Sequence, residues 1–177
     1  MCIRDRPIDD VEVDWRKTKV WGAGGYYARL FVNVRGRETY GTVPAEDLPK
    51  LGAELEAKLR RVKMPNGEML RAQVLSPAKL YRNVRGDPPD FMVYFQDLKW
   101  RSSAQVGGQS MFLAENDTGP DDAVHSFDGV YLLRAGSKSK AKHGPEQQII
   151  DVGPTLLRRM GVSTPDGMQG RPIDAWL

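Results

Sequence analysis

Hydrophobic residues recur with two different periods along this chain. Over residues 26–34 they alternate with polar residues, and aromatic and branched side chains are frequent, which predicts a β-strand paired with an extended stretch at residues 14–21. Between Leu48 and Val62, leucines recur every three or four residues in an otherwise charged segment. This spacing predicts an amphipathic helix, with Asp47 as its N-cap.

Shorter elements follow this helix. Residues 71–75 predict a strand, and Pro77 opens a brief helix that ends near Tyr81. The run from Asp90 to Phe95 is almost continuously apolar, which is typical of a strand buried on both faces. This run favours an α/β layered architecture over an open antiparallel sheet.

Two more elements are predicted near the C-terminus. Residues 129–134 predict a buried strand, because Val130 to Leu133 form an apolar run. Asp151 precedes a helix that stops at Gly161. The inner face of this helix is predicted to carry Leu156, Leu157 and Met160.

The segment from Gln96 to Asp128 has no hydrophobic period. A long irregular segment inside a compact domain is more often functional than idle. It contains Arg101, whose fork of N–H donors could hold a phosphate. A surface salt bridge is the alternative, and it is favoured where no partner motif accompanies the arginine.

Carboxylates gather around a histidine at residues 116–129, which read N-D-T-G-P-D-D-A-V-H-S-F-D-G. His125 and its acidic neighbours are the ligand types that zinc or manganese takes. Alternatively, the aspartates cap and turn the backbone, and His125 is an ordinary surface or packed histidine. Local composition favours this second interpretation, because no complete ligand set is visible.

Composition narrows the class of protein. The 177 residues correspond to one ordinary domain or part of a larger one, and no apolar run is long enough to span a bilayer. The net charge of +3 comes from intermixed basic and acidic residues and does not favour nucleic acid as a partner. The single cysteine, Cys2, fits a reducing compartment, and we expect a cytoplasmic location. Residues 1–10 are expected to be a truncation edge or artefact, and residues 11–177 to form the domain.

Several segments together resemble the C-terminal half of the alkaline phosphatase superfamily, in the branch of type I phosphodiesterases and nucleotide pyrophosphatases and related predicted phosphohydrolases and phosphomutases. The similar segments occur in the order of that family and cover nearly the whole chain after residue 10. They are Val13–Lys19, Phe31–Glu38, Pro88–Asp90, Thr118–His125, Ile150–Leu156 and Met168–Pro172.

The resemblance implies part of an alkaline-phosphatase-like layered domain, with a mixed, largely buried sheet flanked by helices. It implies a metal-dependent phosphoric ester hydrolase that holds two divalent ions, zinc or manganese, and acts on a phosphate-ester small molecule or nucleotide. The last histidine ligand of the family falls on His125. Asp122, beside it in sequence, could orient the ring of His125 from behind, and Arg101 could contact the substrate.

The chain also departs from the family pattern. The nucleophilic Thr or Ser, the first Asp ligand and the Asp-His-Gly ligand motif all lie upstream of the matched region, and nothing in residues 1–16 supplies them. We therefore expect the isolated chain to be inactive and the intact parent to be the enzyme. The alternative is a non-catalytic module that binds an anionic polymer or nucleic acid through the basic loop from Lys138 to Lys142.

Overall fold

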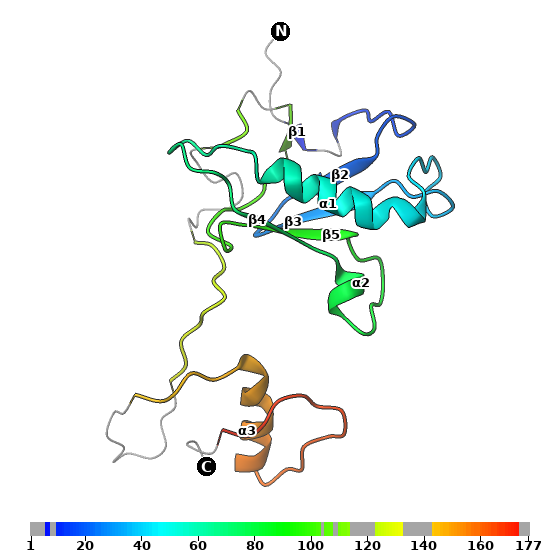
Figure 1. The fold of residues 1–177 in the computed structure, drawn as a ribbon. Helices are drawn as coiled ribbons and strands as arrows, with labels where there is room; N and C mark the ends of the chain where they lie inside the picture. The colour runs from blue at the N-terminus through cyan, green and yellow to red at the C-terminus, as the bar shows by residue number, and fades with distance from the viewer. Residues whose placement is uncertain are drawn as a thin grey trace. The chain divides into compact units, whose positions relative to one another are not determined.

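The computed structural model describes residues 6–7, 10–103, 105–107, 110–113, 123–132 and 143–173. It divides the chain into two compact units, unit 1 at residues 1–128 and unit 2 at residues 129–177 (Figure 1). The described residues have a mixed α/β composition, as the sequence predicts.

The core of unit 1 is a four-stranded antiparallel sheet in the order β2-β3-β5-β4. The strands are β2 (Val20–Ala23), β3 (Ala28–Val32), β4 (Ala72–Leu75) and β5 (Phe91–Phe95). Strands were predicted at β3, β4 and β5, and an extended stretch at residues 14–21 was predicted to pair with the strand at β3. The strand that pairs there is β2, which overlaps the predicted stretch only at Val20 and Trp21 and continues into the predicted glycine connection. The expectations of a mixed sheet, and of a layered rather than an open antiparallel sheet, are wrong for these four strands.

The helix α1 (Leu48–Leu59) covers one face of this sheet, as Figure 1 shows. A short 3-10 turn, η2 (Ala45–Asp47), leads into it, and Asp47 holds the predicted N-cap position without a side-chain capping bond. Leucines of the helix pack against Val32 and Phe91 in the buried core. Gly52 allows this close approach, because a Cβ there would lie 2.7 Å from the ring of Phe91.

The opposite face of the sheet is also covered with large apolar side chains. Trp21 on β2 stacks on Phe31 of β3, with ring centroids 5.6 Å apart, and Trp15 packs edge-on against Trp21. Met92 of β5 is buried on this face. The continuous apolar run of β5 therefore arises because both faces of a central antiparallel strand are covered, not because the strand belongs to a parallel sheet.

Two smaller elements complete unit 1. The helix α2 (Pro77–Leu80) lies where the brief helix was predicted. A pair of two-residue strands, β1 (Arg6–Pro7) and β6 (Gln105–Val106), runs antiparallel. None of the helices in the described ranges could cross a bilayer, since each is too short or too polar.

Unit 2 contains a 3-10 turn, η3 (Ile149–Asp151), followed by the helix α3 (Val152–Arg159). The helix ends as predicted, with Gly161 just beyond it at a positive φ of 71°. Its buried residues are Pro154 and Thr155. The predicted inner face is wrong for Leu156 and Met160, which are exposed, because the helix packs through its first turns.

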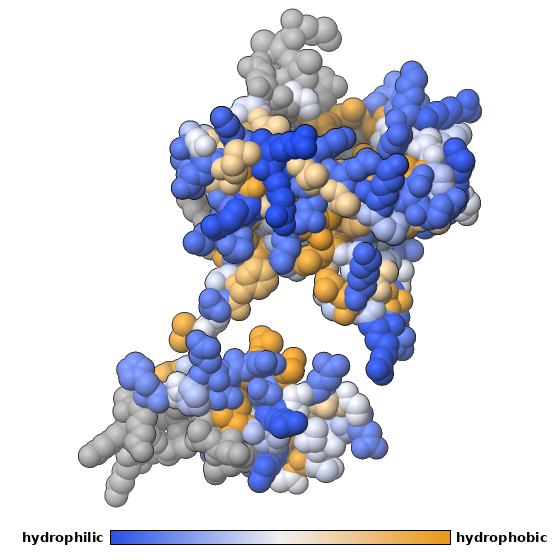
Figure 2. All heavy atoms as spheres, viewed as in Figure 1, coloured by the Kyte–Doolittle hydropathy of each residue, from blue (hydrophilic) through white to orange (hydrophobic). Residues whose placement is uncertain are grey.

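The prediction of a buried strand at Val130 to Leu133 is also wrong for the residues described there. Val130 and Leu132 have relative exposures of 101% and 95%, and residues 129–132 belong to no strand. No described strand of unit 2 offers these residues a backbone to pair with. The surface of unit 2 seen in Figure 2 accordingly includes apolar residues among hydrophilic ones.

Candidate functional site

The candidate site of unit 1 is built around Tyr26, in the connection between β2 and β3. Gly25, just before it, has a positive φ of 140°, a conformation that glycine adopts readily and other residues rarely do. The amide of Gly25 donates to the carbonyl of Ser102 at 2.7 Å, and the amide of Ser102 donates back at 2.9 Å. These two bonds fix the backbone beside Tyr26 to the irregular segment that follows β5.

The segment that follows β5 reverses direction in a turn at residues 96–98. Gln96, Asp97 and Leu98 all have positive φ angles, of 49°, 56° and 68°. Such conformations cost energy in residues other than glycine and persist where surrounding contacts hold them. Here the side chain of Gln96 is buried and accepts a hydrogen bond from the amide of Arg71 at 3.1 Å. The turn brings residues 100–102 back beside the backbone of Gly25.

Arg101 is placed by this pairing. Because Gly25 lies opposite Ser102 in antiparallel register, Tyr26 and Arg101 are the next residues across from each other. The guanidinium carbon of Arg101 lies 4.3 Å from the centroid of the Tyr26 ring, a cation–π contact. Arg101 is partly buried, so it does not extend freely from the surface.

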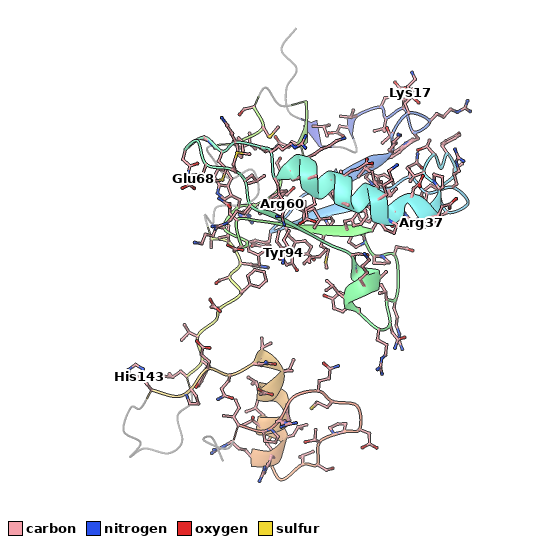
Figure 3. The ribbon with its side chains drawn as sticks, viewed as in Figure 1. Lys17, Arg37, Arg60, Glu68, Tyr94 and His143 are labelled. Atoms are coloured by element: carbon pink, nitrogen blue, oxygen red, sulfur yellow. The ribbon has the colours of Figure 1, made fainter. Side chains whose placement is uncertain are left out.

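His125 reaches the same ring from a distant part of the chain. Its imidazole stacks on Tyr26 with ring centroids 3.9 Å apart and an interplanar angle of 13°. Phe127, two residues on, packs against Tyr94 of β5 with ring centroids 5.6 Å apart, so the segment contacts both the β2–β3 connection and the sheet. Tyr94, labelled in Figure 3, lies on the sheet face opposite α1. Stacking occupies a face of the imidazole, and its two nitrogens project from the ring edge.

The aromatic residues behind this segment form a partly buried group. Tyr27 packs edge-on against Tyr94, with ring centroids 5.5 Å apart. Burial, with smaller contributions from the neighbouring Tyr81 and Tyr27 phenols, raises the pKa of Tyr94. The neutral phenol is therefore the favoured form in the folded chain.

The fit of a metal ion to this site rests on His125. Its exposed imidazole is a ligand type suited to zinc. Within the described ranges, no three His, Cys, Asp or Glu side chains lie together as a metal site requires. Asp121 and Asp122 lie outside the described residues, so the predicted role of Asp122 stays a prediction. A metal role for His125 therefore stays a prediction as well.

A second polar cluster belongs to the fold rather than to this site. Arg37 donates to both carboxylate oxygens of Asp90, each at 2.7 Å, and the amide of Val32 donates to Asp90 Oδ2 at 2.7 Å. Arg37 Nε also donates to Glu38 at 2.9 Å. The hydrogen bond to Asp90 is the main cause of a raised pKa for Arg37; partial burial opposes it, and Glu38 adds to the rise. The pair ties the turn after β3 to the start of β5.

Asn33 and Asp151 likewise connect separate parts of the backbone through hydrogen bonds of their side chains. Asn33 is 2% exposed and donates to the carbonyls of Trp15 and Thr18 at 2.7 and 2.9 Å, which holds the turn before β2. In unit 2, Asp151 accepts a bond from the amide of Arg171 at 2.8 Å. These hydrogen bonds therefore stabilise the fold within each unit.

One cavity of unit 1, of about 1000 Å³, lies apart from the Tyr26 group. It is lined by residues of α1, α2 and the loop before β5, and neither His125 nor Arg101 is among them. Its lining includes Arg37 and Asp90, which neutralise each other. The lining is partly apolar and also includes the charged side chains of Glu38, Glu56, Lys79 and Asp87.

The structure brings together two of the predicted residues, His125 and Arg101, through Tyr26. Tyr26 itself was missed as a site residue, because the alternating pattern placed it in a strand that in fact begins at Ala28. The adjacent glycines were the available signal. The basic loop from Lys138 to Lys142 lies outside the described residues. Comparisons of the chain with protein-family models, curated proteins and solved structures found no match.

Proposed function

We propose that this chain forms the C-terminal part of a metal-dependent phosphoric ester hydrolase related to the type I phosphodiesterases and nucleotide pyrophosphatases. In this proposal the layered alkaline-phosphatase-like domain is completed by sequence upstream of residue 1. That sequence supplies the nucleophile and the remaining metal ligands. The substrate is a phosphate-ester small molecule or nucleotide.

The observation that carries the proposal is the convergence of His125 and Arg101 on the ring of Tyr26. The sequence alone gave no reason for these two residues to be neighbours. His125 and Arg101 each contact the ring of Tyr26, and a phosphate ester could use the imidazole as a metal ligand and the guanidinium as a donor to phosphate oxygens. Backbone pairing of Gly25 with Ser102 places Tyr26 and Arg101 next to each other, and stacking places His125 on the ring of Tyr26.

Each residue has a distinct role in this proposal. His125 presents a ring nitrogen to a divalent ion, for which zinc or manganese is suited. Arg101 donates its N–H groups to non-bridging phosphate oxygens. When bound, the ion supplies positive charge that stabilises charge developing on phosphate and lowers the pKa of an attacking hydroxyl. Tyr26 contacts both side chains through its ring.

The first test is the coding sequence upstream of residue 1. We expect it to encode a Thr or Ser nucleophile and an Asp-His-Gly motif in the same reading frame, and their absence would refute the proposal. The second test uses the polypeptide that carries both parts. There His125→Ala is expected to lower hydrolysis of a nitrophenyl phosphodiester on the order of 100-fold or more, because a metal ligand is lost.

His143→Ala is the matched control for this second test. It removes the other histidine of the chain, which is exposed and lies in unit 2. We expect activity close to that of the unmodified protein. Equal effects of the two substitutions would remove His125 from the site.

A further inference from the structure

We infer that the cavity lined by α1, α2 and the loop before β5 binds an organic cation, in which an ammonium group is carried on an apolar body. The site is independent of the proposed hydrolase function, because neither His125 nor Arg101 lines this cavity. The size of the cavity, its aromatic wall and the sign of its charge all favour this class of ligand.

The cavity has the size and the stiffness of a ligand site. Its volume of about 1000 Å³ lies at the upper end of the range for small-molecule pockets, about 300–1000 Å³. Two hydrogen bonds of 2.7 Å from Arg37 to Asp90 join two parts of its wall. Proline fixes its own φ and so restricts the backbone, and four of the lining residues are prolines: Pro49, Pro77, Pro88 and Pro89. A ligand therefore meets walls that are largely formed beforehand, which lowers the entropy cost of binding.

Aromatic rings form part of the wall. Trp21 and Phe31 both line the cavity, and they stack with ring centroids 5.6 Å apart and an interplanar angle of 18°. Trp15 packs edge-on against Trp21 at 5.1 Å and holds it from the side. Both lining rings are partly exposed, so a ligand in the cavity can reach them. The face of an aromatic ring is negative and attracts a cation, and the attraction is strongest for tryptophan.

The charged residues of the lining also favour a cation. They are four carboxylates and two cationic groups: Glu38, Glu56, Asp87, Asp90, Arg37 and Lys79. Glu56 is paired at 2.6 Å with Arg60, which lies outside the lining. With Arg60 counted, carboxylates still exceed cationic groups by one, because Arg37 is shared between Asp90 at 2.7 Å and Glu38 at 2.9 Å. Glu38, whose side chain is 35% exposed, offers this excess charge to a ligand.

An ammonium group on an apolar body satisfies both features of the wall. It gains attraction from the rings and from the excess carboxylate, while its apolar part covers the uncharged lining. An anion of the same shape meets repulsion from the carboxylate and from the ring faces. The charge of the ligand is therefore the property that a test has to vary.

The test uses three probes that share a phenyl ring and differ in charge: benzyltrimethylammonium, benzyl alcohol and benzenesulfonate. Each is titrated into the full chain. Binding is followed by nuclear magnetic resonance through the amide signals of Gly52 and Gly86 and the indole N–H signal of Trp21, which all belong to lining residues. We expect benzyltrimethylammonium to shift these signals and to bind about tenfold more tightly than benzenesulfonate, with benzyl alcohol between them.

Two substitutions test the proposed contacts. Trp21→Leu should weaken binding of benzyltrimethylammonium about threefold, because the ring with the strongest attraction for a cation is removed. Glu38→Gln should weaken it about threefold as well and leave benzyl alcohol unaffected, because only a charge is lost. Glu54→Gln is the matched control, since Glu54 is exposed on α1 outside the lining and its loss changes the net charge equally. It should leave the affinities for all three probes unchanged.

Three kinds of result would overturn the inference. Benzenesulfonate binding as tightly as benzyltrimethylammonium, or more tightly, would exclude a cation as the preferred ligand. Absence of binding, or signal shifts confined to residues outside the lining, would exclude the cavity as the site. Equal weakening by Glu38→Gln and Glu54→Gln would attribute the preference to the net charge of the chain, and this comparison holds whether or not Trp21→Leu folds.

Discussion

The ion pair between Arg37 and Asp90 gives the sharpest prediction for stability. The perturbations are Arg37→Ala, Asp90→Ala and the double substitution. In the native chain Arg37 makes two bonds of 2.7 Å to the Asp90 carboxylate and donates to the carbonyl of Val32 at 2.7 Å. The Arg37 side chain is 46% exposed, whereas that of Asp90 is 9% exposed.

This difference in exposure sets the expected magnitudes. Removing Arg37 leaves a nearly buried carboxylate with the amide of Val32 as its remaining donor in this cluster, and we expect a loss of about 3 kcal/mol in the free energy of unfolding. Removing Asp90 leaves an arginine that water can reach, so we expect a smaller loss, about 2 kcal/mol. The double substitution should cost less than the sum, with a coupling energy of about 1–2 kcal/mol.

The assay is urea unfolding of the full chain followed by tryptophan fluorescence, since Trp15 and Trp21 pack within unit 1. Arg60→Ala is the control, because its ion pair with Glu56 lies on the helix surface with side chains 65% and 34% exposed. We expect that substitution to cost about 0.5 kcal/mol or less. The structural reasoning is refuted if Arg37→Ala costs no more than Arg60→Ala, or if the two single losses add without coupling.

Two further predictions concern the sheet. Gly52→Ala should lower the free energy of unfolding in the same urea assay by about 1–3 kcal/mol, because the new Cβ would lie 2.7 Å from the buried Phe91 ring. This clash outweighs the better helix propensity of alanine. A gain in stability would contradict the close packing of α1 against Phe91. The second prediction concerns Tyr94, whose pKa is raised in the folded chain. Its neutral phenol contributes to stability below the unfolded pKa of about 10, and this contribution is lost as the pH rises through the folded pKa. When the pH is raised from about 9 to about 11, the free energy of unfolding should therefore fall less in Tyr94→Phe than in the unmodified protein. Equal falls in the two proteins would show that Tyr94 does not cause the pH dependence.

Sequence periodicity predicted α1, β3, β4 and β5 because their signals are local, whereas it was wrong for the apolar run at Val130 to Leu132. The leucine spacing of α1 and the alternation in β3 each arise within one short segment. The topology was harder to predict, because an apolar run such as Phe91–Phe95 indicates burial on both faces without indicating what covers them. Here α1 packs on one face, and on the other face Tyr94 packs against Tyr27 and Phe127.

The candidate site was less predictable, for a related physical reason. His125 and Arg101 were named from their chemistry, but their common neighbour Tyr26 depends on the backbone conformations of Gly25 and of the turn at residues 96–98. Three successive residues other than glycine at positive φ have no sequence signature that a pattern could reveal. Contacts between segments joined by such a turn can only be read from the folded chain.

The residues on which the proposed relationship rests are largely different from the residues that would take part in the reaction. Asn33, Arg37 and Asp90 lie in segments on which the proposed relationship rests, and each holds two parts of the backbone together. Their loss should lower stability, and activity would fall only as the folded fraction falls. His125 is exposed, and its partner in the stack lies outside β3, so its loss should affect ligand binding while the fold persists. Because these residues hold the backbone together, they carry no chemistry by themselves, and the proposed reaction depends on the contacts of His125 and Arg101 with Tyr26.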